Sequence, residues 1–121
     1  MTEILDLDEL QSYLVSSALS GDPGSQFQIT EGRVRTMDRP PYRRLDLGHM
    51  ALAYVRVRRK KQAVLVDISG AWFVPQEAHS ILRPERAATG LMFLVRSRED
   101  ADRAAIGLRM IADHHKQKVQ K

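Results

Sequence analysis

The chain has 121 residues, of which 43% are hydrophobic and 28% charged, with a formal net charge of +4 at pH 7; this composition indicates one folded domain spanning residues 1–121. It contains no cysteine, so disulfide bonds, thiolate catalysis and cysteine-ligated metal sites are excluded. No apolar run approaches the roughly 20 residues that span a bilayer, and the first residues lack the basic and apolar stretches of a secretory signal, so we expect a cytoplasmic protein without a transmembrane segment.

Residues 6–19 are predicted to form an N-terminal helix. Hydrophobic side chains recur there at the three-to-four spacing of one helix face: Leu7, Leu10, Leu14 and Ala18. Asp6 or Asp8 can accept hydrogen bonds from the free amides of the first turn, and acidic groups there complement the positive end of the helix dipole. The cluster of Ser, Gly, Asp and Pro over residues 20–24 ends the helix.

Residues 26–95 are predicted to contain the sheet. The segment from Phe27 to Val34 suggests an extended pair that turns near Glu31-Gly32, and Pro40-Pro41 belongs to a loop or a sheet edge because proline donates no ladder hydrogen bond. Residues 51–58 alternate between apolar and polar side chains, and residues 63–68 form a second β-branched run. The polar connection 59–62 is short enough to join these two strands into a hairpin.

Further strands are expected near the end of this region. Residues 72–74 suggest a strand that Pro75 terminates, and residues 91–95 suggest a short buried strand. Between them, residues 76–90 are predicted to be a loop with one helical turn near Glu77–Ile81.

A C-terminal helix is predicted over residues 98–116, followed by a frayed basic tail at 117–121. Ser97 and Asp100 have the spacing of a capping box. One continuous apolar stripe follows: Ala101, Ala104, Ala105, Leu108, Ile111 and Ala112. Gly107 costs about 1 kcal/mol relative to alanine, which is tolerable where the backbone approaches a neighbour. The expected fold class is therefore α+β, an antiparallel sheet of four to six strands with an N-terminal and a C-terminal helix.

The charges are segregated along the chain. Residues 1–32 contain six acidic and no basic residues, whereas residues 33–61 contain ten basic and two acidic ones. Arginine outnumbers lysine fourteen to five, and the planar guanidinium suits phosphate and carboxylate groups. Two interpretations are open: the acidic N-terminal helix neutralises the basic segment within the molecule, or the basic segment meets a phosphate-bearing or otherwise anionic partner.

The second interpretation predicts a non-catalytic binding or regulatory module whose arginine-rich surface binds nucleic acid or an acidic protein. The residues expected to contact the anionic partner are Arg44, Arg56, Arg58, Arg59, Lys60 and Lys61. Tyr42, which lies between Pro41 and Arg43, is expected to be exposed, where an aromatic ring beside arginines can stack on a base. An alternative is a homo-oligomeric assembly, in which the acidic helix of one copy meets the basic segment of another.

The common sequence signatures of catalysis and metal binding are absent. The chain has no phosphate-loop, dinucleotide-binding, zinc-protease or nucleophile-elbow motif, so no catalytic residue, metal ligand or cofactor is predicted. Four histidines lack a carboxylate at ligand spacing: His49, His79, His114 and His115. Asp67 follows four apolar residues, so we expect a buried or half-buried carboxylate. Trp72-Phe73 is either core packing at a strand end or an interface anchor.

Two short motifs resemble those of the PilZ domain, a small β-barrel family that binds cyclic diguanylate. Residues 39–43 have the form R-x-x-x-R, and Asp67-Ile68-Ser69 has the form D-x-S. Residues 90–94, followed by a helix, are similar to the end of such a domain. The resemblance implies that Arg39 and Arg43 grip the phosphate and guanine groups of cyclic diguanylate, and that Asp67 and Ser69 complete its pocket.

Overall fold

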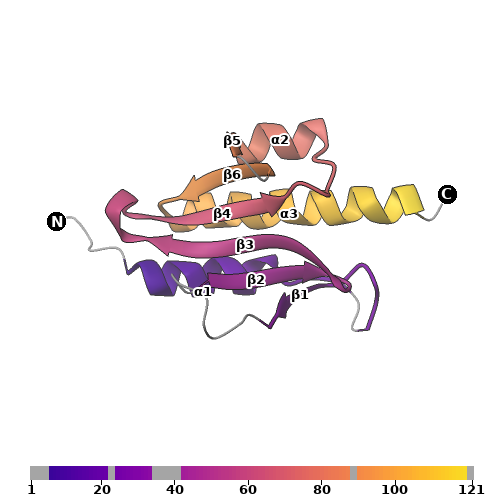
Figure 1. Ribbon diagram of the computed structural model, residues 1–121, viewed down its shortest axis with the longest axis horizontal. Coiled ribbons are helices and arrows are strands. Elements are labelled where there is room, and N and C mark those ends of the chain that lie inside the picture. The colour runs from indigo at the N-terminus through magenta and orange to yellow at the C-terminus, as the bar shows by residue number, and fades with distance from the viewer. Residues whose placement is uncertain (1–5, 22–23, 34–41, 88–89, 120–121) are drawn as a thin grey trace.

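The computed structural model describes residues 6–21, 24–33, 42–87 and 90–119. Its elements follow one another as α1 (Leu7–Ala18), β1 (Ile29–Gly32), β2 (Tyr42–Leu47), β3 (Met50–Arg58), the 3-10 turn η1 (Arg59–Lys61), β4 (Ala63–Ser69), α2 (Gln76–Leu82), β5 (Glu85–Ala87), β6 (Gly90–Val95) and α3 (Arg98–Val119) (Figure 1). The predicted α+β class, with helices near both ends of the chain, is confirmed.

The six strands form one antiparallel sheet in the order β1-β2-β3-β4-β6-β5. The predicted hairpin of residues 51–58 and 63–68 is confirmed, with Arg58 opposite Ala63 at its closed end. A second hairpin joins β2 to β3 through Gly48, whose φ of +62° favours glycine. The pairing of β2 with β3 shifts by one residue between Leu45 and Asp46, which allows both side chains to be buried.

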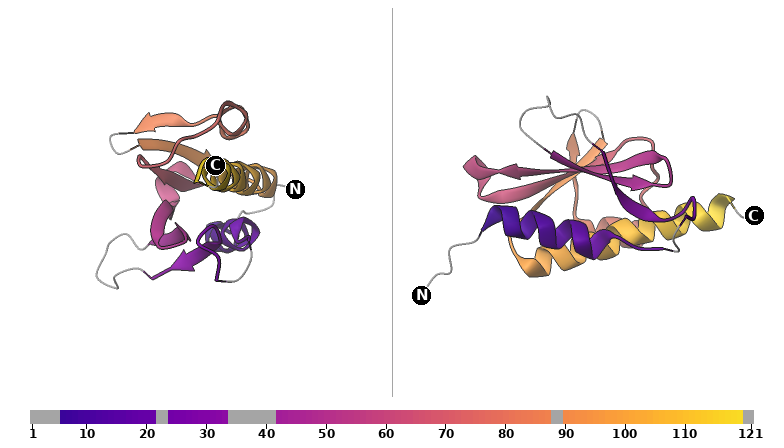
Figure 2. Two further views of the ribbon diagram at one scale, coloured as in Figure 1. Left: turned by 90° about the vertical axis from the view of Figure 1, so that its right-hand side faces the viewer. Right: turned by 90° about the horizontal axis from the view of Figure 1, so that it is seen from below.

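Helices α1 and α3 lie next to each other on one face of the sheet (Figure 2). Strand β4 shows the resulting alternation, because Val64, Val66 and Ile68 are buried while Leu65, Asp67 and Ser69 are half-buried. The core therefore lies between the helices and one side of the strands. No described helix covers the opposite side, which we call the open face. Its central side chains come from β2, β3, β4 and β6.

The starts of α1 and α3 are fixed by the predicted capping residues. The carboxylate of Asp6 accepts hydrogen bonds from the amides of Asp8 and Glu9, at 3.0 and 3.2 Å. At the start of α3 the Ser97 hydroxyl accepts from the Asp100 amide at 3.1 Å, and the Asp100 carboxylate accepts from the Arg96 amide at 3.0 Å. All four bonds satisfy amides near a helix start, where no intrahelical acceptor is available.

The C-terminal helix is longer than predicted. The expected frayed tail at 117–121 is wrong for residues 117–119, which belong to α3; residues 120–121 lie outside the described part. Lysine and glutamine are good helix formers, and Lys116 and Lys118 complement the negative end of the helix dipole. The apolar stripe predicted for this helix is buried as expected.

Three local predictions in the sheet region are also corrected. Glu31-Gly32 is not a turn but the end of β1, paired with Leu45 and Arg44 of β2; Val34 lies outside the described residues. Residues 72–74 are not a strand, because β4 already has β3 and β6 as neighbours and the chain turns away after Ser69. The segment 76–90, predicted as a loop, contains α2 and β5, so the single helical turn expected there is a seven-residue helix.

Candidate functional site

The basic residues of the predicted hairpin connection form a compact tip. Arg59, Lys60 and Lys61 make the 3-10 turn η1, and Gln62 closes it in the left-handed conformation with φ +50°. The amide and the side chain of Gln62 both donate to the carbonyl oxygen of Arg59, at 3.1 and 2.8 Å. This local bonding replaces the Asn-Gly turn that the sequence lacks, and it leaves all three basic side chains exposed.

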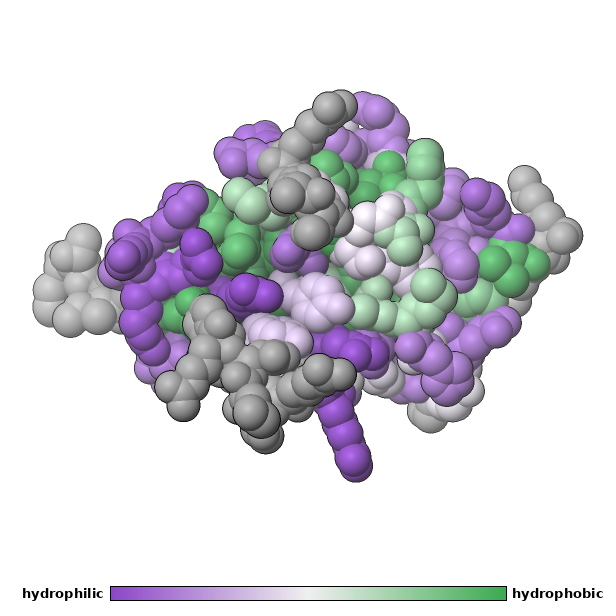
Figure 3. Space-filling view, in the orientation of Figure 1, coloured by the Kyte–Doolittle hydropathy of each residue, from purple (hydrophilic) through white to green (hydrophobic). Residues whose placement is uncertain are grey.

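A groove of about 570 Å³ lies between this tip, the start of β2 and the start of α1. Five of its lining side chains are basic, and one is acidic. The full lining is Asp8, Gln11, Tyr42, Arg43, Val57, Arg58, Arg59, Lys60 and Lys61. Figure 3 shows hydrophilic side chains gathered over the end of the molecule where β3 joins β4. We call this hollow the basic groove.

Arg43 forms one wall of the basic groove and is held by contacts from two other elements. Its guanidinium donates twice to the Glu31 carboxylate of β1, at 2.8 and 2.7 Å, and once to the Ser12 hydroxyl of α1, at 3.0 Å. The paired hydrogen bonds hold the pKa of Glu31 below its usual range and raise the pKa of Arg43. The Arg43 guanidinium is therefore held in place, and the Glu31 carboxylate neutralises part of its charge.

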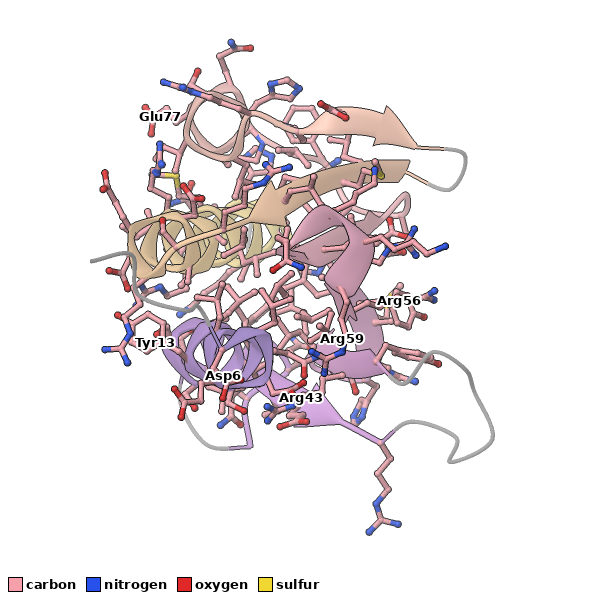
Figure 4. The ribbon with its side chains drawn as sticks, turned by 90° about the vertical axis from the view of Figure 1, so that its left-hand side faces the viewer. Asp6, Tyr13, Arg43, Arg56, Arg59 and Glu77 are labelled. Atoms are coloured by element: carbon pink, nitrogen blue, oxygen red, sulfur yellow. The ribbon has the colours of Figure 1, made fainter. Side chains whose placement is uncertain are left out.

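Among the described residues, the acidic N-terminal segment forms ion pairs with only part of the basic segment. Asp8 pairs with Arg59 at 3.1 Å, but both side chains are about two-thirds exposed (67% and 69%), where an ion pair contributes little and is screened by salt. Figure 4 looks onto this end and shows Arg43 and Arg59 near the start of α1. Among the described residues, no carboxylate forms an ion pair with Arg58, Lys60 or Lys61.

The remaining two predicted contact residues, Arg44 and Arg56, lie on the open face. Arg44 pairs with Asp46 at 2.5 Å, and the hydrogen bond to that buried carboxylate raises the pKa of Arg44. Gly32 allows this pair to lie over β1, because a Cβ at that position would collide with the Asp46 carboxylate. Arg56 instead lies over the ring of Tyr42, with its guanidinium carbon 5.1 Å from the ring centroid.

Tyr42 and Tyr54 form an aromatic pair beside the basic groove. Their centroids are 5.3 Å apart with an interplanar angle of 76°, an edge-to-face arrangement. Tyr42 lies opposite Arg56, and Tyr54 opposite Arg44, in the pairing of β2 with β3. Sequence reasoning singled out Tyr42 but missed Tyr54, although alternation along residues 51–58 places Tyr54 on the same face as Arg56.

The residues implied by the PilZ resemblance do not all come together. Arg43 lies opposite the buried Val55 and reaches α1, so it points to the helix-covered side. Asp67 and Ser69 point to the open face, where Asp67 is half-buried as expected. Arg39 lies outside the described residues. The cyclic diguanylate pocket stays a prediction, and no described contact joins Arg43 to Asp67 or Ser69.

An aromatic cluster marks the opposite end of the molecule. Trp72 packs against the core and donates its indole N–H to the Ala51 carbonyl at 2.8 Å. The ring of His115 lies 4.9 Å from that of Trp72, whereas Phe73 is 62% exposed beside His114. Core packing thus describes Trp72 but not Phe73. Within the described ranges, no group of three or more His, Asp and Glu side chains is placed to hold a metal ion.

No family model, no curated protein and no solved structure matches the chain. None of the described helices is long and apolar enough to cross a membrane.

Proposed function

We propose that the protein is a non-catalytic binding module that captures an anionic partner in the basic groove. The observation that carries this proposal is the presence of Arg58, Lys60 and Lys61 in one groove, without an ion pair to any described carboxylate. Clustered cations raise the local concentration of an anion and speed its association. Phosphate groups and carboxylates are both suitable ligands for these side chains.

The rigid walls of the groove support the proposal. Arg43 is fixed by Glu31 and Ser12, and the tip is closed by Gln62. A ligand therefore meets one guanidinium that is already held in place, beside a tip whose backbone conformation is fixed, which reduces the conformational entropy lost on binding.

The proposal is tested by the salt dependence of binding to labelled anionic polymers: a single-stranded oligonucleotide, a duplex and polyglutamate. The triple variant Arg58→Gln, Lys60→Gln, Lys61→Gln should bind the preferred polymer at least tenfold more weakly at low salt. If that polymer is a nucleic acid, each lost phosphate contact should reduce the slope of log affinity against log salt by about 0.7–0.9.

A matched control removes the same charge elsewhere. Arg96, Lys116 and Lys118 are exposed and lie outside the groove, so their triple glutamine variant should keep most of the affinity and the slope. Equal losses in the two variants would show that net charge alone drives binding and would contradict the proposal.

Self-association, the alternative function, has a separate test. The Asp8–Arg59 and Glu31–Arg43 pairs form within one copy of the chain, so these groups are already partnered without a second copy. If acidic and basic segments of different copies pair nonetheless, sedimentation should show a larger species at low salt that dissociates at high salt.

The PilZ-like alternative is also tested independently of the polymers. Cyclic diguanylate in large excess should raise the melting temperature if it binds the folded protein. An unchanged melting temperature would remove that alternative.

A further inference from the structure

We infer that the anionic partner is a single-stranded nucleic acid, whose bases stack on the Tyr42–Tyr54 pair while its phosphates enter the basic groove. This inference rests on the proposed function and names the class of its ligand. Tyr42 connects the basic groove with the aromatic pair, because it lines the groove and also contacts Tyr54 on the open face.

The aromatic pair provides a surface on which bases can stack, which a groove lined by cations alone does not provide. Base-on-aromatic stacking is available for every base and does not depend on sequence, whereas cations contact only the phosphates. Arg56 extends the surface, since its guanidinium lies 5.1 Å from the Tyr42 centroid and is itself a plane on which a base can stack.

The charges on the open face indicate the path that the bound nucleic acid follows. Asp46 pairs with Arg44 at 2.5 Å, so this carboxylate leaves no uncompensated negative charge beside Tyr42. Beyond Tyr54 the next strand places Asp67 opposite it in the register. A phosphate is repelled there, and the path therefore runs from Tyr54 across Tyr42 toward the tip.

The same observations disfavour the two competing anionic partners. In a duplex the base faces are stacked on each other, so the tyrosine rings have nothing to bind unless the duplex opens. An acidic protein satisfies the cations but offers no nucleobases to stack on the half-buried tyrosine rings. No described helix covers the open face of β2 and β3 (Figure 2), so a flexible single strand can approach this side of the sheet.

The test measures anisotropy of a labelled oligothymidylate of about 12 nucleotides, a length within the usual range for one binding surface. A duplex of the same length and polyglutamate are the competing probes. The wild-type protein should bind the single strand most tightly. Tyr54→Leu and Tyr42→Leu should each weaken single-strand binding by at least about fivefold while leaving the salt slope unchanged.

Tyr13→Leu is the matched control, because Tyr13 lies on α1 and contacts Arg98 and Asp102 away from the groove. It should bind the single strand like the wild type. Circular dichroism melting checks that each variant is folded. Arg56→Gln gives a second measure, because it removes the stacking guanidinium while both tyrosines stay in the sequence. This variant should also weaken single-strand binding. Affinity unchanged in folded Tyr42, Tyr54 and Arg56 variants overturns the inference.

The outcomes separate the inference from the proposed function. If the duplex or polyglutamate binds best and the glutamine variant of the tip loses that binding, the inference is overturned and the proposed function stands. If none of the three polymers binds the wild-type protein, both are overturned.

Discussion

Substituting Gly107 tests how closely α2 and α3 pack. Gly107 lies on the buried stripe of α3, and a Cβ added there would be 2.5 Å from Cγ and 2.9 Å from Cδ1 of Leu82. Favourable carbon–carbon contacts are about 3.5–4.0 Å, so Leu82, which is only 7% exposed, must move by about an ångström. The glycine is thus used where the two helices approach closely, as its sequence position suggested.

Two opposing terms set the magnitude for Gly107→Ala. Helix propensity favours alanine by about 1 kcal/mol, whereas overpacking a buried site costs about 1–3 kcal/mol. We expect a net loss of about 1 kcal/mol in the free energy of unfolding. In a Leu82→Ala background, which itself costs about 2–5 kcal/mol, the obstacle is absent and the same substitution should stabilise the protein by about 1 kcal/mol.

Urea unfolding of the four proteins in this double-mutant cycle measures the change of sign, provided that their m-values agree. A Gly107→Ala effect that is the same in both backgrounds would refute the packing argument. Stabilisation by the full propensity term in the wild-type background would refute it as well.

Three further substitutions test the caps and ion pairs. Asp6→Ala removes the acceptor of two amides at the start of α1 and should cost about 1 kcal/mol in thermal unfolding; no loss would show that solvent replaces the cap. Arg44→Met leaves the Asp46 carboxylate, 8% exposed, without its partner and should cost about 1–3 kcal/mol; adding Asp46→Asn should recover part of this, and a purely additive double variant would contradict the pairing. Because the folded-state pKa of Glu31 is lowered, its contribution is present above the unfolded pKa and is lost as the pH falls through the folded one. Glu31→Gln should therefore be less stable than wild type near neutral pH, by no more than about 1 kcal/mol for so exposed a pair, and the difference should shrink in acid; a gap that does not change with pH would contradict the sign.

The elements that local sequence specifies were predictable. The stripe and capping residues of α3 lie within one continuous segment, so the period of about 3.6 residues and the Ser97–Asp100 box indicate the helix without tertiary information. The β3–β4 hairpin was predictable for the same reason. Residues 72–74 were wrongly predicted as a strand because such an aromatic, β-branched run also suits a turn, from which Trp72 and Val74 pack on the core. Only the strand order excludes a strand there.

The site was predictable only where its residues are consecutive. Residues 58–61 gather because they share one tip. The contacts of Arg43 with Glu31 and Ser12 depend on the pairing of β1 with β2 and on the docking of α1. The placement of Arg43 and Asp67 on opposite sides depends on the register across three strands, and a one-residue slip would reverse it.

The order of the strands also has a consequence for solubility. The sheet ends in β1, with four residues, on one side and in β5, with three, on the other. Each of these edge strands offers only a few main-chain groups to an approaching chain, and short edge strands are poor templates for adding strands from other molecules. The longest strand, β3, is enclosed between β2 and β4, so its main-chain groups are kept from other chains while the protein stays folded.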